Sequence, residues 1–296
     1  MKLIKKTGTL ICTTIFVLSL FIQCTMPVNN EKSDTPQSDN KPTLTPRYNT
    51  RLSDHCLGYY EYLPEGYDPV DKNKEYPLII YIHGVGESGV GNTDELGKLL
   101  LSGPLYEFQK GNLPASFTVN NEEFSFIIIS PQFFSDNSVK EWHFGIFPTE
   151  VDDIVEYMKS HYNVDESRIY LTGSSMGGAR SLTYVAYSSD YGRKIAAMVP
   201  IASYIDEAYP THYIDATEAA SIAASELPIW MIHHTGDYIS NVAWVNNLYS
   251  KLIGMTPEPV LTLIDENTHD GWSKAYSGEL KLNGYNLYEW LLLHNR

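Results

Sequence analysis

Residues 168–186 read Arg168-Ile-Tyr-Leu-Thr172, Gly173-Ser-Ser-Met-Gly-Gly178 and Ala179-Arg-Ser-Leu-Thr-Tyr-Val-Ala186, and this stretch decides the fold. Its first part is an apolar run typical of a strand, and its last part has helix-forming character. The middle part is a Gly-x-Ser-x-Gly pattern, which in this context makes a very sharp turn. Gly173 and Gly177 are required there because the strand and the helix come so close that a Cβ atom would collide. We therefore expect Ser175 at the apex of the turn, with its hydroxyl exposed.

Strand-like and helix-like segments alternate on both sides of this turn. Further apolar runs, several of them continuous in Ile, Leu and Val, occur at Pro77–His83, Phe124–Ser130, Ala196–Ala202, Ile229–His233 and Val260–Ile264. Such runs are typical of parallel strands that are covered on both faces. Helical apolar spacing occurs at Val151–Met158, Val245–Leu252 and Leu287–Leu293. The pattern predicts an α/β fold with a doubly wound, mostly parallel sheet and helices on both faces.

Candidate catalytic residues follow the predicted strands, where ligands bind in sheets of this type. His83-Gly84-Val85-Gly86 ends one strand, and its flexible backbone can turn an N–H group toward a developing oxyanion. Asp237 and His269 each follow a later strand after a short loop. With Ser175 they occur in the chain order Ser, Asp, His, in which a serine-hydrolase triad is found on such sheets.

These segments resemble a known family. Gly173–Gly178, the preceding Val164–Tyr170, the His83-Gly84 pair and His269–Trp272 are similar to the α/β-hydrolase-fold esterases. More narrowly, they resemble the branch that holds feruloyl and acetyl-xylan esterases, polyhydroxybutyrate-depolymerase-like proteins and predicted peptidases related to dienelactone hydrolases. The similarity covers roughly residues 52–296 and is more specific for fold and catalytic class than for substrate. The chain departs from the family at His234, where a glycine often occurs.

The resemblance implies a role for each candidate. Ser175 would be the nucleophile, His269 the base and Asp237 the acid, and the backbone N–H groups of Met176 and Val85 would form the oxyanion hole. A serine hydroxyl is a weak nucleophile, so the imidazole must accept its proton while the carboxylate fixes the tautomer. This chemistry requires no metal and no organic cofactor.

Other residues compete for two of these roles. Asp206, which follows the preceding strand, and Asp215 are the nearest rivals of Asp237. His233 and His234 are the rivals of His269. A metal site at this histidine pair is not expected, because neighbouring strand residues face opposite sides of a sheet.

Substrate choice is expected to lie in the loops. The segments 86–121 and 203–226, each of which lies between two predicted strands, are where we expect it to be encoded. Aromatic residues near the expected cleft are candidates for substrate contact, namely Trp142, Tyr204, Tyr209 and Tyr213.

The N-terminus has the features of an export signal. Lys2, Lys5 and Lys6 precede an apolar run from Leu10 to Ile22 that is too short to span a bilayer. Cys24 directly behind it resembles a bacterial lipoprotein processing site, where the thiol is acylated, although Gln23 is unusual before such a cysteine. The alternatives are ordinary signal-peptidase cleavage and an uncleaved anchor. Residues 25–50 are rich in Pro and Asn and predict a flexible tether.

These boundaries divide the chain into a signal peptide (1–23), a tether beginning at a lipidated Cys24 (24–50) and a catalytic domain (51–296). The net charge of −15 argues against a nucleic-acid partner. We predict an exported, lipid-anchored protein of a bacterial envelope, or otherwise a periplasmic or secreted one. It would be a serine carboxylic-ester hydrolase acting on small-molecule or polysaccharide esters, with feruloyl or acetyl esters of plant polysaccharides favoured. The alternatives are a serine peptidase acting on small peptides and a binding protein on a disabled hydrolase fold.

Overall fold

The computed structural model describes residues 41–134, 147–205 and 214–296. The strands are β1 (Thr43–Arg47), β2 (Cys56–Leu63), β3 (Tyr76–Ile82), β4 (Phe117–Val119), β5 (Glu122–Phe124), β6 (Ile127–Phe133), β7 (Val164–Ser174), β8 (Ala197–Ile201), β9 (Trp230–His234) and β10 (Val260–Ile264). The α-helices are α1 (Gly103–Lys110), α2 (Pro148–His161), α3 (Met176–Tyr187), α4 (Ser189–Arg193), α5 (Ala216–Ala224), α6 (Val242–Leu252), α7 (Trp272–Tyr276) and α8 (Leu287–Leu292). Two short 3₁₀ helices are η1 (Val85–Glu87) and η2 (Leu96–Leu100). None of the helices in the described ranges has the length and apolar character that crossing a bilayer requires.

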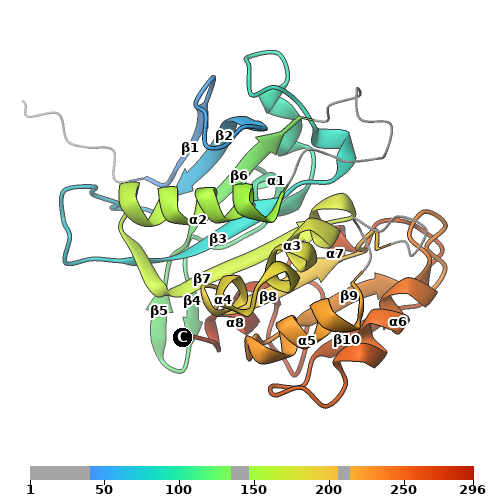
Figure 1. Cartoon of the computed structure of the whole chain (residues 1–296). Coiled ribbons are helices and arrows are strands. Elements are labelled where there is room, and N and C mark those ends of the chain that lie inside the picture. The colour runs from blue at the N-terminus through green and yellow to red at the C-terminus, as the bar shows by residue number, and fades with distance from the viewer. Residues whose placement is uncertain (1–40, 135–146, 206–213) are drawn as a thin grey trace, which may run out of the picture. The chain divides into compact units, whose positions relative to one another are not determined.

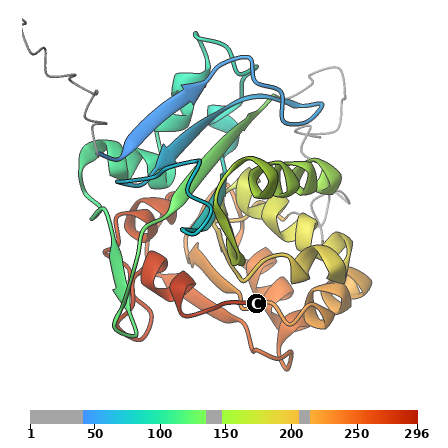
Figure 2. The same ribbon diagram turned by 90° about the vertical axis from the view of Figure 1, so that its left-hand side faces the viewer.

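Eight of the strands form one twisted sheet in the order β1-β2-β6-β3-β7-β8-β9-β10 (Figure 1). β1 and β2 run antiparallel to their neighbours, and the remaining neighbours are parallel. A separate hairpin is formed by β4 and β5. Helices lie on both sides of the sheet. Figure 2 shows the yellow-green α2 and α3 on one side and the red C-terminal helices on the other. The predicted α/β class and the mostly parallel, doubly wound sheet are confirmed.

Both faces of the sheet are buried, which explains the continuous apolar runs. Leu78, Ile80 and Ile82 of β3 point into one core, which they share with α2, α3, α5 and α6. Ile79 and Tyr81 point into the other, which they share with η2, α1, α7 and α8. Strand residues alternate between faces, so a strand with helices on both sides must be apolar at every position.

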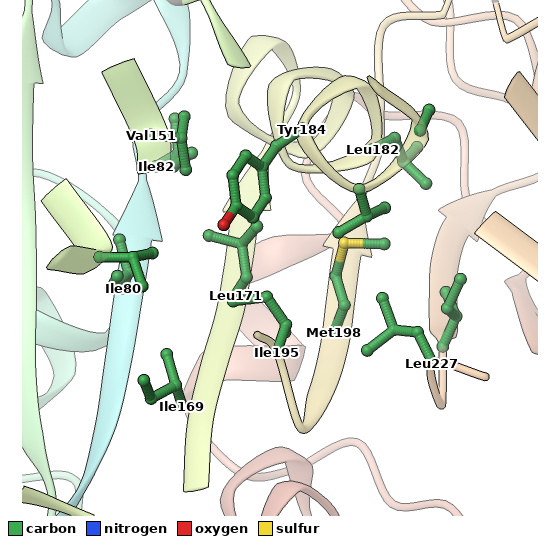
Figure 3. Close-up of a cluster of buried hydrophobic side chains, with 14 of the residues drawn as sticks. Ile80, Ile82, Val151, Ile169, Leu171, Leu182, Tyr184, Ile195, Met198 and Leu227 are labelled. Atoms are coloured by element: carbon green, nitrogen blue, oxygen red, sulfur yellow. The ribbon is translucent and has the colours of Figure 1, made fainter. Parts of the chain in front are cut away.

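Neighbouring strands contribute to one continuous layer beneath α3. Figure 3 shows Ile80, Leu171 and Met198, from β3, β7 and β8, on the same side of the sheet as Leu182 and Tyr184 of α3. Full burial of such a side chain contributes on the order of 2 kcal/mol. The strand that ends at the Gly-x-Ser-x-Gly turn, β7, therefore has a partner strand on each edge and a hydrophobic core on each face.

Two predicted boundaries are wrong. The boundary at residue 51 is too late, because Thr43–Arg47 form the outermost strand β1, where Pro46 is tolerated and Arg47 pairs with the buried Glu61 of β2. The strand predicted at 124–130 is shifted, because Phe124 belongs to the β4–β5 hairpin and β6 continues to Phe133. Pro131 lies in the part of β6 that the prediction does not include. It comes after Ile129, which is the last residue of β6 that pairs with β3.

Candidate active site

Ser175 occupies the sharp turn between β7 and α3, as the glycine pattern predicts. Its backbone has φ 53° and ψ −114°, a strained conformation for a residue with a side chain. A Cβ atom on Gly177 would lie 1.9 Å from the carbonyl oxygen of Ile82, and one on Gly173 would lie 2.5 Å from the carbonyl carbon of Gly177. The Ser175 N–H donates to the carbonyl of Ile201 at 2.9 Å, which ties the turn to β8.

The structure brings Ser175, His269 and Asp237 together from three strand ends. His269 Nε2 lies 2.8 Å from Ser175 Oγ, and His269 Nδ1 lies 2.6 Å from Asp237 Oδ2. A carboxylate can only accept, so Nδ1 carries the hydrogen and Nε2 of the neutral ring accepts from the Ser175 hydroxyl. The Asp237 side chain is fully buried, whereas that of His269 is 14% exposed.

The Asp237 carboxylate is held from two sides. Its Oδ1 accepts the backbone N–H groups of Ile239 at 2.9 Å and Ser240 at 2.8 Å, and Oδ2 faces His269. Burial alone would raise the pKa of Asp237. The hydrogen bonds from His269, Ser240 and Ile239 outweigh burial and hold this pKa below its ordinary value. The group is therefore an anion with one oxygen committed to the loop and one to the imidazole.

The two residues predicted to supply the oxyanion hole each begin a helix. Met176 is the first residue of α3 and Val85 is the first residue of η1. The first N–H groups of a helix have no acceptor within that helix. A Cβ atom on Gly84 would lie 3.6 Å from the carbonyl oxygen of Ser174, so the loop that carries Val85 packs against the serine turn.

His83 holds this loop in place as a neutral ring. Its Nδ1–H donates to the carbonyl of Gly84 at 2.6 Å, and its Nε2 accepts the N–H of Phe133 at 3.0 Å. Full burial lowers the pKa of His83 to about 4, because the charged form is not solvated there. With both ring nitrogens committed to the backbone, His83 serves loop architecture.

The neutral His83 should make stability depend on pH. As the pH falls below the ordinary value of 6.5, the unfolded chain takes up a proton at His83, but the folded chain does not until about pH 4. His83 therefore lowers the free energy of unfolding as the pH falls through this window, and its own contribution to the loss is about 2 kcal/mol between about pH 7.5 and about pH 5. Urea unfolding at both pH values measures the loss in the wild type.

The matched variant is His83→Asn, which keeps a donor near Gly84 but does not titrate. Its stability should fall less than that of the wild type over the same interval. His233 and His294, whose pKa values are also lowered by burial, remain in both proteins. The difference between the stability losses of the wild type and the variant therefore isolates His83. Equal losses in the two proteins would contradict a neutral, buried His83.

Sequence reasoning missed a second anchor of the same loop. The buried side chain of Gln132 donates from Nε2 to the carbonyls of Glu87 and Glu95 at 2.8 and 2.9 Å, and its Oε1 accepts the N–H of Gly91 at 3.0 Å. Gln132 lies within the apolar strand β6. The predicted strand ends at Ser130, two residues before Gln132, so the sequence does not indicate a buried amide that must find partners.

The rival residues have structural partners. Asp215 caps α5 by accepting the N–H groups of Thr217 and Glu218, and Asp206 lies outside the described residues. His233 Nε2 donates to the carbonyl of Ser240 at 2.8 Å. His234 occupies the position where the resembled family often has a glycine. Its Nδ1–H donates to the carbonyl of Thr268 at 2.9 Å, which supports the loop before His269.

The described residues hold no group of His, Cys, Asp or Glu side chains suited to a metal ion. Of the predicted substrate contacts, Tyr204 is partly buried, and its N–H donates to the carbonyl of Ser175 at 3.2 Å. Trp142, Tyr209 and Tyr213 lie outside the described residues, as does Cys24. Trp272, directly after the His269 loop, sets its ring edge-on to the imidazole at 5.2 Å.

Residues 70–277 match the phospholipase/carboxylesterase family, which is more than half of the chain. The chain belongs to the phospholipase/carboxylesterase family. This membership confirms the α/β-hydrolase fold and the hydrolase class that the sequence predicts. A bifunctional acetylxylan esterase/xylanase of Neocallimastix patriciarum is 27% identical to this chain over 177 residues. That match covers 59% of this chain but only 21% of the relative's length.

Solved structures of this carboxylesterase fold superpose over most of the chain. A thermostable esterase has a TM-score of 0.56 at 22% identity, covering 81% of this chain and 59% of its own. A feruloyl esterase module of Clostridium thermocellum, complexed with sinapinate, has a TM-score of 0.53 at 17% identity, covering 84% and 88%. A ferulic acid esterase of the anaerobic fungus Anaeromyces mucronatus has a TM-score of 0.52 at 18% identity, covering 82% and 90%. At these identities the likeness shows the fold.

Proposed function

We propose that this member of the carboxylesterase family hydrolyses carboxylic esters by a serine mechanism. The observation that carries the proposal is the pair of contacts from His269, 2.8 Å to Ser175 Oγ and 2.6 Å to Asp237 Oδ2. Distances of this size are within reach for proton transfer. They join a nucleophile, a base and an orienting carboxylate in one line.

The reaction follows from these positions. Ser175 Oγ attacks the ester carbonyl while its proton passes to His269 Nε2, and the N–H groups of Val85 and Met176 stabilise the oxyanion. His269 then gives the proton to the departing alcohol, which leaves an acyl group on Ser175. Water repeats the attack with the same base and releases the acid. Each oxyanion donor contributes on the order of 10²–10³ in rate.

Feruloyl or acetyl esters of plant polysaccharides are the substrate class we favour. The support is the resemblance to an acetylxylan esterase/xylanase and the fold shared with feruloyl esterases. Val85, whose N–H is the proposed oxyanion donor, and Tyr238, the residue after the proposed acid, both have exposed apolar side chains, and we propose that an aromatic acyl group rests on them. Measuring the hydrolysis of representative esters tests this substrate class directly.

A hydrolysis panel tests the function. We expect p-nitrophenyl acetate and either methyl ferulate or acetylated xylan to be turned over, and aminoacyl amides not to be. Faster turnover of the amides than of every ester would make the protein a peptidase. Folded wild type that hydrolyses nothing on the panel and resists labelling by a fluorophosphonate probe would instead indicate a binding protein.

We further propose that residues 1–23 are a signal peptide and that Cys24 is acylated. The support is the basic start, the short apolar run and the cysteine that follows it. Changing Cys24 to serine should move the protein from the membrane fraction to the soluble fraction after cell lysis. Cys12→Ser, which alters the other cysteine of this region, should leave fractionation unchanged. A Cys24→Ser variant that stays on the membrane would contradict the lipid anchor.

A further inference from the structure

We propose that Glu87 is a positioning residue for the oxyanion hole, which it fixes through a chain of hydroxyl groups ending at Ser174, the residue before the nucleophile. The inference rests on the proposed function, since it concerns how the Val85 N–H is held relative to Ser175. Glu87 closes the same short helix η1 that Val85 opens.

This chain of hydroxyl groups connects four parts of the fold by hydrogen bonds. Ser102 Oγ donates to Glu87 Oε1 at 2.7 Å, Ser102 Oγ and Tyr81 Oη lie 3.1 Å apart, and Tyr81 Oη lies 2.9 Å from Ser174 Oγ. Ser102 precedes α1, Tyr81 is in β3 and Ser174 ends β7. The chain therefore connects the oxyanion loop to the strand that carries the serine turn.

The direction of each bond follows from counting hydrogens. Ser102 has one hydroxyl hydrogen, and it is committed to the Glu87 carboxylate. Tyr81 must then donate to Ser102, and Ser174 must donate to Tyr81. All three dipoles point toward the carboxylate, and such an aligned chain strengthens each bond in it.

The backbone is shaped around these contacts. Gly103, directly after Ser102, has φ +79°, and a Cβ atom there would lie 2.5 Å from Tyr81 Cε1. A Cβ atom on Gly84 would lie 3.2 Å from Glu87 Oε2, so the second carboxylate oxygen folds back against the loop. Tyr81 is fully buried. Burial raises the pKa of Glu87, while the Ser102 hydroxyl opposes that rise.

The arrangement matters because an oxyanion donor works only at the right place. η1 has one turn, and the Val85 side chain is 49% exposed, so packing of that side chain does little to hold the loop. A displacement of about 1 Å at a reacting centre can cost on the order of 100-fold in rate. His83 and Gln132 hold the backbone of this loop, and the Glu87 carboxylate adds a side-chain constraint that connects η1 to the sheet.

The test compares Glu87→Ala with Glu87→Gln, which keeps an oxygen for the Ser102 hydroxyl. For p-nitrophenyl acetate, Glu87→Ala should lower kcat about 30-fold with KM nearly unchanged, because the donor acts mainly in the transition state. Glu87→Gln should retain kcat within about threefold. Binding of phenylboronic acid, whose tetrahedral adduct places an oxygen in the oxyanion hole, should weaken in parallel with kcat. Glu95→Gln is the control. The Glu95 carboxylate accepts the Val90 N–H in the same loop, but it is not one of the groups that form the hydroxyl chain from Glu87 to Ser174.

A second measurement does not depend on activity. Amide hydrogen exchange of residues 83–90 should accelerate in Glu87→Ala and stay at the wild-type rate in Glu95→Gln. Unchanged exchange in Glu87→Ala, unchanged kcat, or an equal loss in Glu87→Gln would each overturn the positioning role. If the wild type neither hydrolyses esters nor reacts with fluorophosphonate, the proposed function fails, while the exchange result still decides whether Glu87 holds the loop.

Discussion

The Ser175→Ala variant should lose ester hydrolysis almost completely, with kcat for p-nitrophenyl acetate about 10⁵-fold below wild type or lower. The hydroxyl is the atom that forms the acyl bond, and no other described side-chain oxygen is within hydrogen-bond distance of His269 Nε2. Fold should be preserved, because the change removes one atom from a turn whose shape is set by the glycines around it. The measurement is steady-state hydrolysis, together with fluorophosphonate labelling, which should disappear.

The matched control is Ser181→Ala in the same helix. Ser181 is buried, and its hydroxyl donates to the carbonyl of Gly177 at 2.9 Å, so it is a serine of the same helix whose hydroxyl is committed to the helix backbone. Its kcat should stay within about threefold of wild type, since a local bond of this kind carries about 1 kcal/mol of stability. A Ser175→Ala variant with a tenth of the wild-type activity would reject the serine mechanism.

The sheet and the three residues at its edge were predictable because their signals are local. Continuous apolar runs mark strands covered on both faces, and the residue after each run must lie at the carboxyl edge. Ser175, Asp237 and His269 each follow such a run, so knowing the strands places them at the same edge without any knowledge of the loops. The glycines flanking Ser175 add a steric requirement that is also visible within five residues.

β1 and β2 were missed because their stability comes from distant partners. β2 contains Glu61, a residue that argues against a buried strand until its partners are known. Arg47 and Tyr162 both bind that carboxylate, and the second lies 101 residues away in sequence. The pairing that makes Glu61 acceptable in the sheet exists only in the folded chain.

The support of the site was missed for the same reason. Gln132 reaches the loop around Gly91 across 41 residues, and Tyr81 reaches Ser174 across 93. Single polar residues inside apolar strands are weak signals, because most buried polar groups serve structure alone. Reactive groups are predictable from motifs, whereas the groups that hold them depend on the tertiary arrangement.

Changing Asp237 to asparagine should lower kcat about 10⁴-fold while leaving the backbone intact. The reason lies in the two N–H donors on Oδ1. Ile239 and Ser240 both donate to that oxygen, so the asparagine amide must place its carbonyl oxygen there and turn its NH₂ group toward His269. His269 Nδ1 then has to accept, which moves its hydrogen to Nε2. The ring would face Ser175 as a donor, in the wrong tautomer to remove a proton.

Asp270→Asn is the control that separates this tautomer effect from a loss of charge near the imidazole. Asp270 is next to His269 in sequence, but its carboxylate accepts the N–H and hydroxyl of Ser273 and makes no contact with the ring. Steady-state kinetics should show kcat within about threefold of wild type for Asp270→Asn, as expected for a partly exposed carboxylate that hydrogen-bonds at the start of its own helix. If the two variants lost activity equally, negative charge near His269 would be the cause. A large loss confined to Asp237→Asn, with KM unchanged, would support the tautomer effect. The N–H groups of Ile239 and Ser240 would then act on catalysis by requiring an oxygen at the Oδ1 position, which decides the group that faces His269 and so the tautomer of its ring.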